Sequence, residues 1–173
     1  DHRDLHSFPT RRSSDLKGLP VEITEDALWK VEAYRLALFL SEVAWHDMSK
    51  LWKDERTRGL ADQLYRAGCS ISANIADGYS KSTGKDRARF FEYALGSARE
   101  SRDWYYKAHH VLGDEISQHR IQLTTPIVRL LMTMVPQQRT GGSIREEKGV
   151  YQTSADALAQ STDEIIYKEI PLP

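Results

Sequence analysis

The sequence predicts an all-α protein, an up-down-up-down antiparallel four-helix bundle with disordered ends. Apolar residues recur at intervals of three and four along four segments between residues 26 and 139, which is the period of amphipathic helices. No segment of this region reads convincingly as a β-strand, and the connections are short, which favours antiparallel neighbours. At 173 residues the chain is long enough for one domain with a sizeable core.

The composition is that of a globular protein rather than a membrane protein. Hydrophobic residues make up 40% of the chain, charged residues 28%, and the formal net charge is -1. No apolar run approaches the ~20 residues of a membrane span, and no secretory signal is visible at the start. The single cysteine, Cys69, excludes an intrachain disulfide and fits a reducing compartment. We therefore expect a cytoplasmic protein without a membrane partner.

The two ends differ from the patterned middle. Residues 1–16 have no helical or strand period and resemble the translation of a sequencing-adapter oligonucleotide, so we expect a disordered assembly artefact on a truncated metagenomic gene. Residues 17–25 would form a leader. Residues 140–173 are polar and contain two adjacent glycines, which predicts a disordered tail. Its last residues, EIIYKEIPLP, carry apolar groups that could dock on a partner.

The first helix is expected over residues 27–50, with Glu25 and Asp26 placed favourably near its N-terminus. One face is approximated by residues spaced three or four apart, and further apolar residues widen it. The face comprises Leu28, Val31, Tyr34 or Arg35, Leu38, Glu42 and Trp45, widened by Leu36, Phe39, Leu40 and Val43. A charged loop follows over residues 51–56.

The second and third helices are expected over residues 57–79 and 85–112, the latter stopping at Gly113. Their facing stripes are rich in small residues, which lets two helix axes come close, so we expect this to be the tightest pair. The second stripe contains Leu60, Leu64, Ala67, Ile71, Asn74, Ile75 and Gly78. The third contains Phe90 or Phe91, Ala94, Ser97 or Ala98, Ser101, Trp104 or Tyr105, Ala108 and Leu112.

The fourth helix is expected over residues 114–135, with a proline in its interior. Pro126 removes one backbone hydrogen bond, and Thr125 could cap a fresh helix that begins at this proline. We therefore expect a kink or a short break. The apolar face is Ile116, Leu123, Ile127, Leu130, Leu131 and Met134.

A polar stripe runs beside the apolar seam of residues 63–78, QLYRAGCSISANIADG. With polar groups of the facing helix, it predicts a buried or half-buried Arg–carboxylate network that fixes helix register. The alternative is acid–base catalysis by Arg66, Asp77 and Glu100. The predicted network comprises Gln63, Arg66, Ser70, Asn74, Asp77, Ser97 and Glu100.

Other chemistry finds no support in the sequence. His109 and His110 are adjacent and point in different directions on a helix, and no pair of His or Cys residues between 26 and 139 has the spacing of metal ligands. Cys69 has no neighbouring His or second Cys, although nearby Arg66 could lower its pKa. We therefore predict no catalytic residue, no metal and no cofactor.

The densest basic run lies between the second and third helices. Lys81, Lys85, Arg87 and Arg89 are opposed only by Asp86, and aromatic residues flank them. Residues 27–137 hold sixteen Lys and Arg against thirteen Asp and Glu, a net charge of +3. A basic helix N-terminus can hold phosphate, so these four residues and Arg66 are the predicted nucleic-acid contacts. The alternative is an ordinary solvated turn.

Two sequence blocks carry a resemblance to a known family. QLxRAxxSIxANIADG over residues 63–78, with KxxxRFFxxAxGSAxE over 85–100 and Trp29, resembles the four-helix bundle proteins encoded in intervening sequences of bacterial 23S rRNA genes, called S23-like. The likeness covers residues 28–135 and implies a bundle without known enzymatic activity. This chain departs from the family at Asp77, where glutamate is usual, at Pro126 and in its long tail.

The same resemblance implies partners. The family includes the accessory variability protein of diversity-generating retroelements, which forms a pentamer and binds a reverse transcriptase and nucleic acid. By this likeness we expect self-association, with a pentamer as the implied assembly, and binding of RNA or a nucleoprotein. The alternative is a protein–protein adaptor, such as a reverse transcriptase accessory, without a direct nucleic-acid role.

Overall fold

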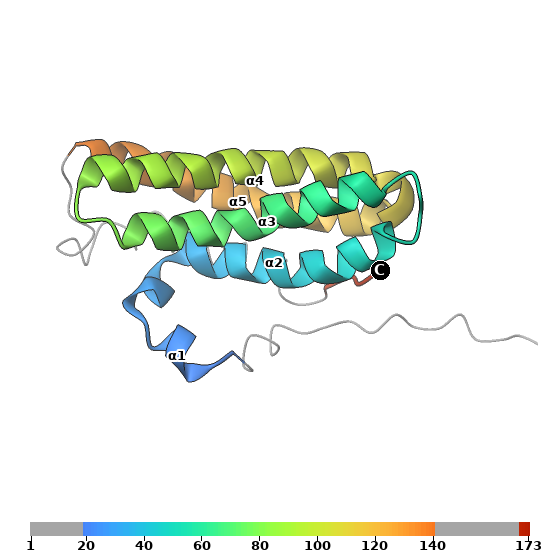
Figure 1. Ribbon diagram of the computed structural model, residues 1–173, viewed down its shortest axis with the longest axis horizontal. Helices are drawn as coiled ribbons and strands as arrows, with labels where there is room; N and C mark the ends of the chain where they lie inside the picture. Colours follow the sequence, from blue (N-terminus) through green and yellow to red (C-terminus); the bar gives the residue numbers. More distant parts are fainter. Residues whose placement is uncertain (1–18, 141–169) are drawn as a thin grey trace, which may run out of the picture.

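The computed structural model describes residues 19–140 and 170–173, and within them four long helices lie side by side (Figure 1). Each helix contacts the next, and α2 also packs on α5, which closes the bundle. The predicted all-α class and four-helix bundle are confirmed. The expectations for residues 1–18 and 141–169 lie outside the described residues. The helices are α2 (Glu32–Leu51), α3 (Arg58–Tyr79), α4 (Gly84–Leu112) and α5 (Asp114–Arg139).

The core forms where the four apolar stripes meet. On α3 and α4 the buried residues follow the expected spacing. For α4, where the sequence left two neighbouring residues open at three positions, one residue of each pair is buried. Phe91, Ala98 and Tyr105 are buried on α4, whereas the other members of these pairs, Phe90, Ser97 and Trp104, are half-buried. Burial of one stripe from every helix against the others satisfies all four at once.

The N-terminal part of the first predicted helix is a separate segment. Residues 27–30 form a 3-10 turn, η2 (Ala27–Lys30), preceded by the single turn α1 (Val21–Thr24), and α2 begins only at Glu32. The carboxylate of Asp26 accepts a hydrogen bond from the Leu28 amide at 2.7 Å and starts this turn. Val31 then adopts an extended conformation, φ -80° and ψ 107°, which ends the turn before α2.

The central line of the face predicted for α2 is wrong by about one residue step, whereas the widening residues Leu36, Phe39, Leu40 and Val43 are buried as expected. Glu42 and Trp45 are exposed, and Trp45 is 54% accessible. Apolar residues surround more than half of this helix, so spacing alone leaves its buried side ambiguous. The buried seam is Leu36, Leu40, Val43, Asp47 and Leu51, with a charged residue within it.

The turns at both ends of α4 have clear sequence causes. Thr83 caps the helix: its Oγ1 accepts from the Asp86 amide at 3.1 Å and donates to the Asp86 carboxylate at 2.7 Å. At the other end a single residue, Gly113, joins α4 to α5 at φ 92°, a left-handed value that favours glycine.

Helix α5 is continuous through Pro126 and extends to Arg139, so the predicted break does not occur. The hydroxyl of Thr125 does not cap a new helix but donates to the Ile121 carbonyl at 2.8 Å, one turn back. Leu123 and Ile127 are fully buried on either side of the proline. Their burial stabilises the helix enough to offset the missing backbone bond, which costs about 3 kcal/mol.

The close approach of α3 and α4 is centred on Gly78. A Cβ atom at this position would lie 2.7 Å from Cε1 of Phe91, whose ring is fully buried. The expected proximity of these helices is therefore present at their turn end, although α4 makes its most extensive contact with α5.

Residues 170–173 correct the expected tail at its extreme end. Ile170 is 1% exposed and belongs to the hydrophobic core, and Leu172 packs against the same core. The aliphatic character of these two side chains explains why the chain returns to the bundle here.

We predict opposite effects for alanine at two helical glycines. Gly78→Ala lowers the free energy of unfolding by about 1–3 kcal/mol, because the new methyl overpacks against Phe91. Gly96→Ala raises it by about 0.5–1 kcal/mol, since its Cβ meets no atom within 4 Å and alanine loses less entropy in a helix. Urea unfolding followed by circular dichroism measures both. Equal effects at the two positions would contradict the close approach at Gly78.

Candidate nucleic-acid interface

Four predicted contact residues gather where α3 turns into α4. Lys81 follows the end of α3, and Lys85, Arg87 and Arg89 occupy the first turns of α4. We call these four residues the basic turn. The positive end of the α4 dipole lies among them, which adds to a potential that attracts anions.

An aromatic ring organises the basic turn. The Lys81 ammonium lies 4.6 Å from the centre of the Phe90 ring, and the Arg89 guanidinium lies 5.5 Å from it. Tyr93 packs edge-on against Phe90 at 5.8 Å and is 53% exposed. Cation–π contacts orient the two charges over one ring, so cations and exposed aromatic surface occur together at this end of the bundle.

The cations of the basic turn differ in their burial and in their contacts with other protein groups. Arg89 lies 3.7 Å from the Asp86 carboxylate, an exposed contact of little energetic weight. Lys85 is exposed, whereas Arg87 is half-buried with its Nε atom buried and without a hydrogen-bond partner. Lys85 and Arg89 are therefore the residues best placed to meet a ligand.

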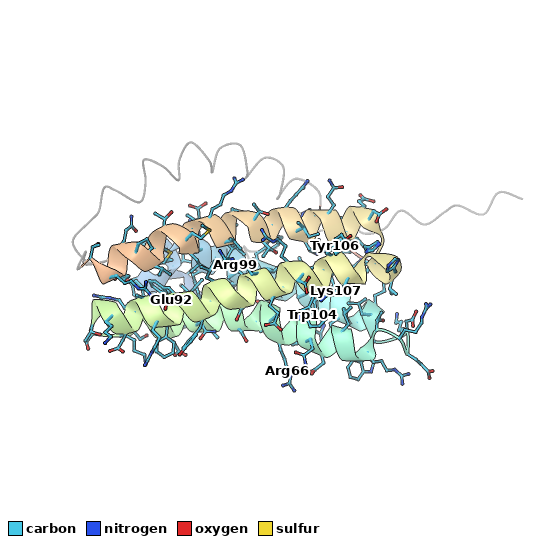
Figure 2. All side chains as sticks on the ribbon, turned by 90° about the horizontal axis from the view of Figure 1, so that it is seen from above. Arg66, Glu92, Arg99, Trp104, Tyr106 and Lys107 are labelled. Atoms are coloured by element: carbon cyan, nitrogen blue, oxygen red, sulfur yellow. The ribbon has the colours of Figure 1, made fainter. Side chains whose placement is uncertain are left out.

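Arg66 does not belong to this group. It lies thirteen residues before the end of α3, about 20 Å along the helix axis. Its Nε atom donates to Asp62 at 3.1 Å, and the side chain points outward from α3 (Figure 2). The polar stripe of α3 is therefore too long for Arg66 and the basic turn to form one small nucleic-acid contact.

The polar network predicted between α3 and α4 is not what the structure assembles. Its side-chain groups bond within their own helices: Arg66 pairs with Asp62, Asn74 donates to the Ser70 carbonyl, and Glu100 accepts from the Trp104 indole. Gln63, Asp77 and Glu100 are exposed, and Ser97 contributes only its carbonyl, which accepts from buried Ser101. Arg66 and Asp77 lie eleven residues apart, about 16 Å along α3, so they cannot pair.

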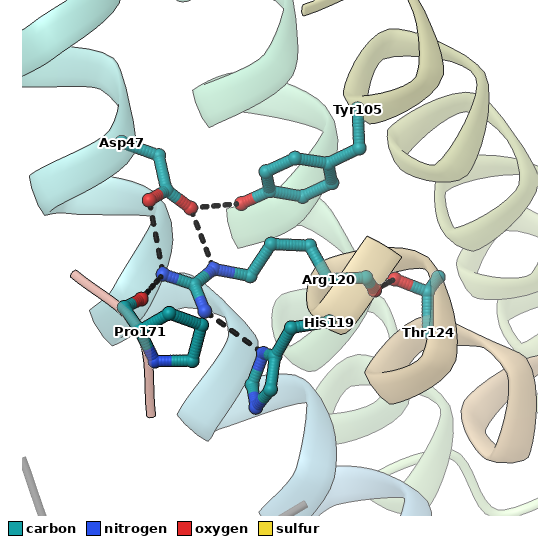
Figure 3. A network of polar contacts seen from close by, with 6 residues as sticks. All are labelled: Asp47, Tyr105, His119, Arg120, Thr124 and Pro171. Carbon is teal, nitrogen blue, oxygen red and sulfur yellow. Dashed lines mark hydrogen bonds and ion pairs between the residues drawn. The ribbon is translucent and has the colours of Figure 1, made fainter. Parts of the chain in front are cut away.

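The buried Arg–carboxylate pair lies instead between α2 and α5 (Figure 3). Arg120 and Asp47 are both 0% exposed, and two parallel hydrogen bonds of 2.8 and 3.0 Å join them. The Tyr105 hydroxyl of α4 donates to the same carboxylate at 3.0 Å. Burial first, then the Asp47 charge, raises the pKa of Tyr105 well above its ordinary value, so the phenol stays a donor.

The remaining donors of Arg120 are also directed at acceptors. Nη1 lies 2.8 Å from Nδ1 of His119, and Nη2 donates to the Pro171 carbonyl at 2.8 Å. The Arg120 carbonyl accepts from the Thr124 hydroxyl at 2.6 Å. With Asp47 and Tyr105, this set connects three helices and the C-terminal residues in one polar cluster.

The sequence contains an indication of this pair, because each of the two charged residues occupies a core position of its helix. A search for apolar residues alone does not find it. Asp47 falls on the seam Leu40, Val43 and Leu51, and Arg120 falls four residues after Ile116 on the seam of α5. Opposite charges at core positions of two helices indicate partners. Nothing in the local pattern shows that residues 73 positions apart meet.

Metal and thiol chemistry gain no support from the described residues. No group of three His, Cys, Asp or Glu residues in residues 19–140 and 170–173 is arranged to hold a metal ion. Cys69 is free and half-buried, and burial raises the pKa of its thiol, with the Tyr65 hydroxyl acting in the opposite direction. Arg66 therefore does not activate it. Within the same described ranges, none of the helices combines the length and apolarity that crossing a bilayer requires.

Comparison with known proteins gives a family and a fold. Residues 30–133 match the family model described as 23S rRNA-intervening sequence protein. One similar solved structure is a protein of unknown function from the S23 ribosomal protein family of Bacteroides thetaiotaomicron. It is 20% identical, with a TM-score of 0.56, over 60% of this chain and 97% of that one, a likeness of fold alone. No match was found among curated proteins.

We predict strong coupling between Asp47 and Arg120. Arg120→Met alone lowers the free energy of unfolding by about 3–5 kcal/mol, because it leaves a buried carboxylate without its partner. The double variant Asp47→Leu/Arg120→Met costs much less than the sum of the two single changes. Urea unfolding of the four proteins gives the coupling energy. Additive losses would show that the two residues act independently.

Proposed function

The chain belongs to the family of 23S rRNA-intervening sequence proteins, and for this member we propose a non-enzymatic bundle that binds RNA through its basic turn and associates with itself. The observation that carries the RNA proposal is the position of the Lys81 and Arg89 cations over the Phe90 ring, beside exposed Tyr93 and in the same turn as Lys85 and Arg87. Cations bind phosphate, and aromatic faces accept unstacked bases.

The charge balance sets the expected strength of this binding. The whole chain has a formal net charge of -1 and a pI near 6.7, so the attraction for RNA is local to one end of the bundle. The opposite end, at the α2–α3 turn, mixes Lys53 and Arg56 with Asp54 and Glu55. A small cationic site of this kind binds weakly and is strongly reduced by salt.

The self-association proposal rests on another surface. Tyr106 and Met132 are 67% and 54% exposed, on the side of the bundle formed by α4 and α5. Arg99 lies seven residues before Tyr106 on the same face of α4, and its guanidinium contacts the Met132 sulfur at 3.8 Å. Exposed aromatic, methionine and arginine side chains are typical of the centre of protein interfaces.

The same surface favours the alternative function, a protein adaptor without a nucleic-acid role. An adaptor would use the α4–α5 side, or the EIIYKEIPLP end, to hold a partner such as a reverse transcriptase. The two functions separate experimentally, because an adaptor binds no RNA and its partner contact does not depend on the basic turn.

We predict that RNA affinity depends on the basic turn. Lys85→Gln/Arg89→Gln reduces the slope of log affinity against log salt by about 1.4 for single-stranded RNA, since two phosphate contacts are removed. Fluorescence anisotropy with a short labelled RNA across a salt series measures this slope. Both side chains are exposed, so the fold should be unchanged.

The matched control removes two charges from the other end of the bundle. Arg56→Gln/Arg58→Gln, at the α2–α3 turn, should leave the slope unchanged, as should Arg66→Gln on the side of α3. Equal losses in the two double variants, or no RNA binding by the unaltered chain, would reject the RNA proposal and favour the adaptor.

We predict that the α4–α5 surface supports self-association. Tyr106→Glu/Met132→Glu lowers the mass in solution to that of one chain, 19.8 kDa, because it places charge in the proposed contact. Light scattering coupled to size exclusion measures the mass. The control is Trp45→Glu, which alters an equally exposed residue on α2 and leaves the mass unchanged. A wild-type chain that is monomeric at high concentration would contradict this prediction.

A further inference from the structure

The last four residues, 170–173, occupy a defined site on the bundle, and Figure 3 shows Pro171 of this segment beside Arg120. We call these residues the C-terminal strap. Ile170 is 1% exposed within the hydrophobic core, and Leu172 lies partly buried against it. Between them, the Pro171 carbonyl accepts the hydrogen bond from Arg120. The strap therefore combines an apolar anchor with a main-chain contact to a buried guanidinium within two residues.

This combination is a mode of peptide recognition. A main-chain hydrogen bond gives affinity for any extended segment, and a pocket for one side chain gives selectivity. The prolines at 171 and 173 carry no amide hydrogen, so they bury no unpaired donor, and their fixed φ limits the entropy lost on binding. The chemistry fits an aliphatic residue followed by proline in an extended chain.

The site does not depend on the strap for its own organisation. The Arg120 charge is balanced by Asp47 through two hydrogen bonds, and Asp47 is held in turn by Tyr105. These three residues lie on α2, α4 and α5, which pack directly on one another. A guanidinium held in this way remains aimed at the strap position when the strap is absent.

The strap can reach this site from its own chain. Arg139 ends α5 nineteen residues beyond Arg120, about 29 Å along the helix axis. Residues 141–169 connect the helix end to the strap, and 29 residues span such a distance several times over at about 3.4 Å each. Attachment to the same chain also gives the strap an effective concentration on the order of millimolar.

We propose that the surface around Arg120 is a binding site for extended aliphatic-proline peptides, occupied in the native chain by its own exchangeable C-terminal strap. The occupant is the strap of the same chain, and a free segment of the same pattern competes with it. This inference is independent of RNA binding.

The test uses the full chain carrying Ile170→Asp, which removes the apolar anchor. The melting temperature falls by roughly 5–10 °C, because a buried isoleucine is lost from the core. A synthetic peptide of residues 164–173 then binds this variant in calorimetry and restores most of the loss. The same peptide binds the unaltered chain at least tenfold more weakly, since the tethered strap competes with it.

Two controls isolate the site. The peptide carrying Ile170→Asp neither binds nor restores the melting temperature. The variant Val21→Asp makes the same kind of change at an exposed position and lowers the melting temperature little. Peptide that fails to bind Ile170→Asp would overturn the proposal and make residues 170–173 a fixed part of the core. Dimers that dissociate on Ile170→Asp would instead place the strap on a second copy.

A second measurement serves if Ile170→Asp does not fold. In the unaltered, isotope-labelled chain, excess unlabelled peptide should shift the Leu172 amide resonance towards the position of a free peptide. The Arg120 Nε–H resonance should persist throughout, because its bond to Asp47 is unaffected. A Leu172 resonance that does not move at millimolar peptide would overturn the exchange.

Discussion

The rest of the structure depends on the ion pair between Asp47 and Arg120, which joins the first and last long helices. Two fully buried charges are stable only when each is matched in position and hydrogen-bonded. That requirement allows one relative rotation and one sliding position of α2 against α5. The apolar seams alone would accept several, because aliphatic side chains have no preferred partner. Tyr105 extends the same constraint to α4.

The general architecture followed from the sequence because amphipathic period and short connections are local properties. Helices α3 and α4 were predicted within one residue at each end, and for α4 the capping chemistry of Thr83 and Gly113 explains both ends. The buried side of α2 was not, because apolar residues extend around most of that helix. Nor was the continuity of α5 through Pro126, where packing of Leu123 and Ile127 outweighs a local preference.

The candidate sites also differ in how far the sequence predicted them. The basic turn is made of residues close in sequence, so its grouping survives folding whatever the helices do. Arg66 lies on the polar stripe of α3 but far from the basic turn. The spacing of residues in a stripe shows which side of the helix they occupy, and it does not place them close together along the axis. The cluster around Arg120 is made by residues far apart in the chain, and two charges on apolar seams were its sole sequence signal.

The one-residue junction at Gly113 makes the chain sensitive to changes in length. Each residue added to a helix turns everything beyond it by about 100°. One extra residue between Gly113 and Arg120 would therefore carry the guanidinium off the seam of α5 and leave Asp47 facing apolar side chains. The same holds for Tyr105 on the other side of Gly113, whose hydroxyl must reach the same carboxylate. The lengths of α4 and α5 on either side of this junction are thus fixed by one buried acceptor.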